Sequence, residues 1–81
     1  MHVYRPRMGN AAMQKRLGTA IRKARQQAGY SQDSFADAID MHRAYYSAIE
    51  RGERNLTIAT LGRVAAGLKL SIADLATEAK L

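Results

Sequence analysis

Residues 40–55, DMHRAYYSAIERGERN, gather guanidinium groups, phenol rings and small side chains in one short segment. An arginine can donate two hydrogen bonds to the O6 and N7 atoms of guanine, and an alanine can contact the methyl group of thymine. Hydroxyl and further arginine side chains are typical ligands of phosphate oxygens. The residue types in this segment therefore favour recognition of a polyanion over bond-making chemistry.

Residue types elsewhere in the chain do not indicate catalysis. His2 and His42 are the only histidines, and neither has Asp, Glu or Cys near it in sequence at metal-ligand spacing. The serines lack a plausible His–Asp pair, and the six glycines are scattered instead of forming a phosphate-binding loop. We expect no enzymatic activity, no metal, no cofactor and no small-molecule ligand.

The charge distribution supports a polyanionic partner. The 81 residues carry 13 Lys and Arg against 7 Asp and Glu, a net charge of +6, and residues 1–25 contain no acidic side chain. Nucleic acid and an anionic membrane surface both fit this asymmetry, and a merely solvated helix face is the plainer alternative. The chain has no cysteine, no apolar run that could span a bilayer and no apolar N-terminal stretch, so we expect a cytoplasmic protein.

Periodicity and capping residues predict one all-α domain at 10–81, after a flexible basic arm at 1–9. Five helices are expected, at 10–28, 32–39, 43–50, 57–67 and from 71 onward, with Asn10, Ser31, Thr57 and Ser71 as caps. Asp74 lies three residues after Ser71, which is the spacing of a capping box. Helices of two turns are marginal in water, so the second and third must be held by their neighbours.

The second and third predicted helices form a helix-turn-helix pattern. In QDSFADAIDMHRAYYSAIER, residues 32–51, apolar and small residues recur so that one short helix packs across another through a tight turn. Asp40 lies in this turn, and aspartate tolerates positive φ better than most residues. Tyr46 falls on the inner side with Ile49, whereas Tyr45 faces outward. The first residues of such a second helix can enter a DNA major groove.

Residues 17–76 resemble the Cro/phage-repressor-like (XRE) family. The resemblance rests on IRKARQQAGYSQDSFADAI, YYSAIERGERN and LTIATLGRVAAGLKLS, and is greatest to the controller proteins of restriction–modification systems. It implies a five-helix, lambda-repressor-like domain and a homodimeric transcriptional regulator on a pseudopalindromic operator. It also implies a structural ion pair between Arg25 and Glu50. The expected partners are double-stranded DNA and a second copy of the chain, and RNA polymerase is a further candidate.

The outer side of the third helix and the loop after it supply the candidate DNA contacts. The predicted base-reading residues are Arg43, Ala44, Ser47 and Ala48, although Ala48 fits a helix–helix interface equally well. The predicted backbone contacts are Gln32, Tyr45, Arg51, Arg54, Asn55 and Thr57, and the plainer interpretation of each is a solvated side chain.

Apolar residues after position 56 exceed what one small core needs, which predicts a dimer contact. Its expected members are Ile58, Leu61, Val64, Leu68, Leu70, Ile72 and Leu75. The alternative is that the last helix merely closes the core of the monomer. Two other functions remain open from the residues: an antitoxin or other protein-interaction module on the same fold, and a basic amphipathic helix at 10–28 on a membrane surface.

Overall fold

Five α-helices make up the regular structure of residues 11–81, the part of the chain that the computed structural model describes. They are α1 (Ala11–Gln27), α2 (Gln32–Ala38), α3 (Arg43–Glu50), α4 (Ile58–Gly67) and α5 (Ile72–Glu78). Within these residues there is no strand, which confirms the predicted all-α class. The expected arm at 1–9 and the cap at Asn10 lie outside the described residues.

Helices α2, α4 and α5 begin where short polar side chains satisfy their free N–H groups. Ser31 and Ser71 form capping boxes with Ser34 and Asp74, and Thr57 accepts a hydrogen bond from the N–H group of Thr60. The hydrogen bonds from the backbone and side chain of Ser71 lower the pKa of the Asp74 carboxyl. These caps confirm the predicted starts of α2, α4 and α5. They are local features, which explains why the sequence alone located them.

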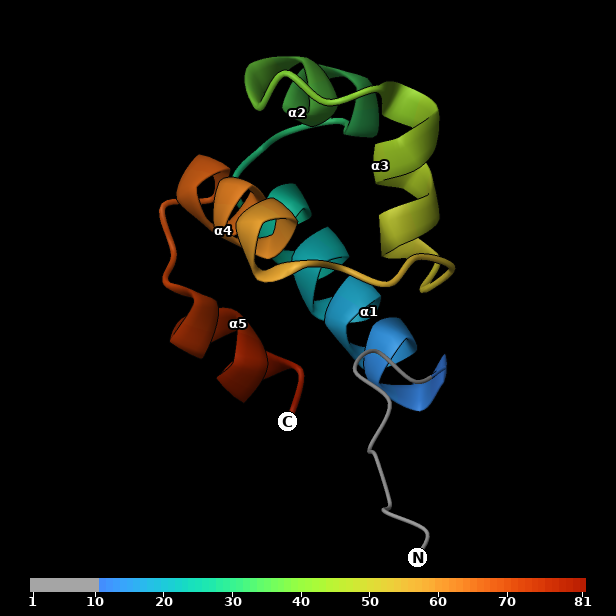
Figure 1. Cartoon of the computed structure of the whole chain (residues 1–81). Helices are drawn as coiled ribbons and strands as arrows, with labels where there is room; N and C mark the ends of the chain where they lie inside the picture. The colour runs from blue at the N-terminus through green and yellow to red at the C-terminus, as the bar shows by residue number, and fades with distance from the viewer. Residues whose placement is uncertain (1–10) are drawn as a thin grey trace, which may run out of the picture.

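Helix α1 runs through the middle of the molecule, with α2 and α3 on one side and α5 on the other (Figure 1). The core between them is centred on two rings, since Phe35 of α2 and Tyr46 of α3 lie with centroids 5.2 Å apart. Both side chains are fully buried, together with Ile21, Ile49, Val64 and Leu75. The two-turn helices α2 and α3 are thus held by packing, as their length requires.

The turn between α2 and α3 has a tether that the sequence did not reveal. Asp40 takes φ of +53°, the left-handed conformation expected for it. From α4, Nη2 of Arg63 donates hydrogen bonds of 2.6 Å to the carbonyl oxygen of Ile39 and 2.7 Å to that of Asp40. Nδ1 of His42 then accepts a hydrogen bond of 3.3 Å from the N–H group of Ala44 and caps α3. The turn is therefore fixed from both ends.

Part of the predicted dimer contact belongs to the monomer core. Val64, Leu68 and Leu75 are buried, because α4 and α5 turn these side chains inward, so their assignment to a dimer contact was wrong. Ile58 is exposed, and Leu61, Leu70 and Ile72 are half-buried. These four are the residues of the predicted set that are not buried in the monomer. None of the described helices is long and apolar enough to cross a membrane.

Gly18 allows α1 to approach the end of α3 closely. A Cβ atom at this position would lie 2.5 Å from the carbonyl oxygen of Glu50 and 2.6 Å from that of Ile49. Backbone oxygens cannot move aside as a side chain can. The absence of a side chain at Gly18 is therefore a condition for the α1–α3 contact.

We predict that Gly18→Ala destabilises the protein by about 1–3 kcal/mol, because it overpacks this contact. Gly62→Ala is the matched control, since a Cβ there would meet only Cδ1 of Ile72, at 3.9 Å. Alanine is the better helix former, so the control should gain about 0.5–1 kcal/mol. Urea unfolding followed by circular dichroism measures both changes. Equal effects of the two substitutions would contradict the steric argument.

Candidate nucleic-acid interface

Helix α3 divides sharply into a buried side and an open side. Tyr46, Ile49 and Glu50 face the other helices, while His42, Arg43 and Ala44 are exposed at its start. A shallow depression of about 400 Å³ lies over the open side, lined by His42, Arg43, Ala44, Ser47 and Arg51. The arrangement places polar and cationic groups on one accessible surface that runs along α3 from His42 at its start to Arg51 at its end.

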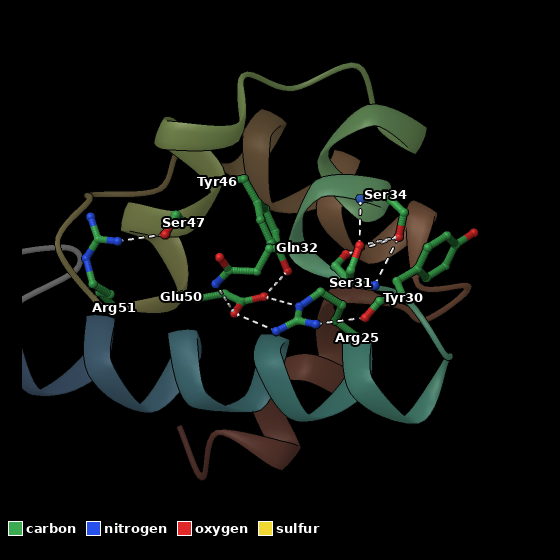
Figure 2. Close-up of polar contacts among 9 residues, drawn as sticks. All are labelled: Arg25, Tyr30, Ser31, Gln32, Ser34, Tyr46, Ser47, Glu50 and Arg51. Atoms are coloured by element: carbon green, nitrogen blue, oxygen red, sulfur yellow. Dashed lines mark hydrogen bonds and ion pairs between the residues drawn. The ribbon is translucent and has the colours of Figure 1, made fainter.

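The carboxylate of Glu50 joins three helices through four donors (Figure 2). Arg25 of α1 donates from Nε at 2.6 Å and from Nη2 at 3.1 Å. Gln32 of α2 donates from Nε2 at 2.9 Å, and the hydroxyl of Tyr46 donates from within α3. Nη1 of Arg25 is itself satisfied by the carbonyl oxygen of Tyr30, at 2.7 Å. The structure thus joins Arg25 and Glu50, the two side chains that the family resemblance pairs.

These contacts set the protonation of the cluster. Burial alone would raise the pKa of Glu50, but the hydrogen bonds from Arg25, Tyr46 and Gln32 outweigh it, so its pKa is lowered. Burial and the bond to Glu50 raise the pKa of Tyr46, and the bond to Glu50 raises that of Arg25. Glu50 is therefore a carboxylate and Tyr46 a neutral phenol at neutral pH. The polar groups of Arg25, Gln32, Tyr46 and Glu50 bond to one another inside the protein. They therefore hold the helices together and are not presented to a ligand.

Two arginines on the open side each pair with a nearby carboxylate. Nε of Arg43 forms an ion pair with Oδ1 of Asp33, which lies in the first turn of α2. Nε of Arg51 lies 3.1 Å from Oε1 of Glu53. Nη1 of Arg51 also donates to Oγ of Ser47 at 2.6 Å (Figure 2). Both guanidinium groups remain exposed, with further N–H donors available to a ligand.

The loop between α3 and α4 adds a second group of predicted contact residues. The guanidinium carbon of Arg54 lies 5.0 Å from the centroid of the Tyr45 ring, a cation–π contact. Asn55 accepts a hydrogen bond from the side-chain amide of Gln14, and Thr57 caps α4. Arg54, Asn55 and Thr57 are all exposed. They lie along the chain that leaves the lower end of α3 (Figure 1).

Two of the predicted DNA-contacting residues are less accessible than expected, and the assignment of a third, Ala48, to base reading was wrong. Gln32 and Tyr45 are half-buried, since Gln32 bonds to Glu50 and Tyr45 packs at the edge of the core. Ala48 is buried, with only 7% of its surface exposed, so it cannot present itself to a base pair. Its small side chain serves the packing of helices, the alternative that the sequence had left open.

Three residues that shape this site were not predicted from the sequence. They are Asp33, which pairs with Arg43, Arg63, which binds the turn, and His42, which caps α3. Each acts through a partner on another element or through capping by an uncommon residue type. The one available signal for Asp33 was an acidic side chain in the first turn of a helix, which also occurs for purely electrostatic reasons.

Comparison with known proteins identifies the class to which this architecture belongs. The HTH_3 helix-turn-helix family matches residues 21–75, from the middle of α1 into α5. The match spans most of the chain and includes both helices of the motif. The chain therefore belongs to the HTH_3 helix-turn-helix family.

Individual relatives narrow the comparison. Control protein C.MunI of a Mycoplasma species is 39% identical over 64 residues, which cover 78% of this chain and 86% of that protein. The clp gene regulator ClgR of Corynebacterium glutamicum superposes with a TM-score of 0.79 at 31% identity, covering 84% of this chain and 88% of the other. The restriction–modification controller protein C.Esp1396I, solved as a tetramer in complex with its natural 35 base-pair operator, superposes with a TM-score of 0.73. It is 32% identical, over 85% of this chain and 96% of the other.

We predict that the Glu50 cluster makes stability fall at acid pH. The folded-state pKa of Glu50 lies below its unfolded value of about 4.3, so the folded protein binds fewer protons in this range. Its contribution is complete above that value and is lost as pH falls toward the lower, folded-state pKa. Chemical unfolding between pH 7 and pH 3 measures the loss.

Two variants isolate this contribution. Glu50→Gln should cost roughly 3–5 kcal/mol at pH 7, because it leaves Arg25 buried without its charge partner, and it should flatten the acid-side slope. Glu78→Gln is the control, since Glu78 is exposed and forms no ion pair within the described part of the chain. An unchanged slope in Glu50→Gln would show that other carboxyl groups govern acid unfolding.

Proposed function

We propose that the protein is a homodimeric, sequence-specific regulator of transcription that binds a pseudopalindromic operator in double-stranded DNA. The observation that carries the proposal is the open N-terminal edge of α3, held outward by the Glu50 cluster in a helix-turn-helix domain. The controller relatives support a narrower form, the controller of a restriction–modification system. Such a regulator acts on cytoplasmic DNA without a catalytic step, by admitting or excluding RNA polymerase.

Arg43 is the principal base-reading residue in this proposal. It is the first residue of α3 and lies beside Ala44. The side chain of Ala44 is small and exposed, so the helix could approach the base pairs of a major groove closely at this point. Arginine donating to O6 and N7 of guanine is the commonest specific contact in the major groove. Ala44 would contact a thymine methyl group, and Ser47 a base edge. Ser47 already accepts from Arg51, and its own hydroxyl hydrogen remains to be donated.

The backbone contacts surround this edge. Arg51 and Arg54 would neutralise phosphates on either side of the groove, and Asn55 and Thr57 lie exposed between them and the start of α4. Gln32 and Tyr45 would contact phosphates through the parts of their side chains that remain accessible. Contacts of this kind fix the register of the helix on the duplex but do not read its sequence.

The dimer contact would form around the exposed start of α4. Ile58 is 65% exposed and borders an apolar hollow that includes Leu56, Leu61 and Leu81, and contiguous apolar surface of this kind is typical of an interaction site. Leu70 and Ile72 add half-buried apolar surface. One recognition helix reads too few base pairs to find a site in a genome, so a second copy is functionally required.

We predict that Arg43→Ala relaxes base preference at one position of each half-site and costs roughly 1–3 kcal/mol in specific binding. Selection from random duplexes by the native protein would define the preferred site. Titration of that site and of single-base-pair variants at fixed salt would then measure the preference.

Arg54→Ala is the matched control, because loss of a phosphate contact should weaken binding to all duplexes about equally and reduce the salt slope by about 1. Native protein that selects no preferred sequence would refute the proposed function. A native-like preference in Arg43→Ala would refute only the role given to that arginine.

We predict that Ile58→Asp converts the dimer to a monomer at micromolar concentration while the monomer stays folded. A charge at this exposed position opposes burial in an interface but disturbs no core contact. Val64→Ala should instead destabilise the protein by about 1.5–3 kcal/mol at every concentration, because Val64 lies in the core. Sedimentation equilibrium and thermal unfolding across a concentration series separate the two effects. Unchanged self-association in Ile58→Asp would place the contact elsewhere.

A further inference from the structure

Asp33 meets the principal arginine of the proposed interface from a different helix. It lies in the first turn of α2, and its Oδ1 atom pairs with Nε of Arg43 at the start of α3. The side chains remain 70% and 67% exposed, so the pair lies on the open surface and not in the core. An exposed pair of this kind adds little to folding stability. Its position on the recognition edge suggests another use.

The pair leaves the reading edge of the guanidinium free. Arginine has five N–H donors in a rigid plane, one on Nε and two on each Nη atom. A carboxylate bonded to Nε occupies one edge of the planar guanidinium and limits rotation of the Arg43 side chain. The outward N–H groups of the two Nη atoms remain available for the bidentate contact with O6 and N7 of guanine. Arg43 would then meet the duplex with much of its rotational freedom already lost.

We propose that Asp33 is a positioning residue that orients Arg43 and thereby sets the guanine specificity of this arginine. The inference rests on the proposed DNA-binding function and adds a residue of α2 to the determinants of specificity. Asp33 itself need not touch a base. The carboxylate also carries a cost, because it brings a negative charge toward the phosphates of the duplex.

The chain contains a matched pair in which this positioning role is not expected. Nε of Arg51 lies 3.1 Å from Oε1 of Glu53, with side chains 54% and 57% exposed. The same guanidinium nitrogen is paired and the exposure is similar, but Arg51 is proposed to bind phosphate. Glu53→Gln therefore reports what loss of one nearby negative charge does by itself.

The experiment compares native protein, Asp33→Asn, Glu53→Gln, Arg43→Ala and the double variant Asp33→Asn/Arg43→Ala. Each is titrated at fixed salt with the selected duplex and with duplexes that replace one base pair at a time. Arg43→Ala marks the base pair that Arg43 reads. Asp33→Asn should lose discrimination at that base pair by about twofold to fivefold and at no other. It should cause no further loss in the Arg43→Ala background, and Glu53→Gln should retain full discrimination.

Other outcomes overturn the inference in distinguishable ways. If Asp33→Asn raises affinity for all duplexes equally, as Glu53→Gln should, Asp33 acts only through its charge. If Asp33→Asn lowers the melting temperature and leaves discrimination unchanged, its role is confined to the dipole of α2. If Arg43→Ala keeps every preference, positioning by Asp33 is refuted while DNA binding stands. Native protein without any sequence preference refutes the proposed function and the inference together.

Discussion

The structure depends on one buried carboxylate. Glu50 closes α3, and its two oxygens accept hydrogen bonds from Arg25 of α1, Gln32 of α2 and Tyr46 of α3 itself. A charge taken out of water is costly unless donors replace the lost hydration, and here no buried side-chain nitrogen or oxygen of the described residues lacks a partner. A helix of only eight residues is thereby fixed to two others.

This constraint explains how such a short helix can serve as a recognition element. An isolated two-turn helix would not persist in water, and a helix held on all sides would have no surface to offer. The Glu50 cluster and the Phe35–Tyr46 contact hold α3 by its inner side only. The open side presents Arg43 and Arg51 from a helix whose backbone is already ordered, so little backbone freedom remains to be lost on binding. Stability and accessibility thus come from opposite sides of one helix.

Much of the fold was predictable because its signals are local. Thr57, Ser31 and Ser71 marked helix starts through their own hydrogen bonds, and Asp40 took the positive φ that its turn required. The Arg25–Glu50 pair was expected only from the family resemblance. Contacts between distant segments leave no recognisable pattern in the sequence. The hydrogen bonds from Arg63 to the turn at 39–40, for example, join residues more than twenty positions apart. The proximity of Asp33 to Arg43 likewise depends on how α2 crosses α3.

The sequence by itself determined where the helices lie and which of their sides are apolar, since capping and periodicity act between residues a few positions apart. Only the tertiary structure decided what covers each apolar side. It placed Val64, Leu68 and Leu75 in the core and left Ile58 exposed, and it buried Ala48 within the helix expected to read DNA. The periodicity of apolar residues predicts which side chains are buried. Whether such a side chain is buried against its own chain or against a partner depends on how the helices pack in space.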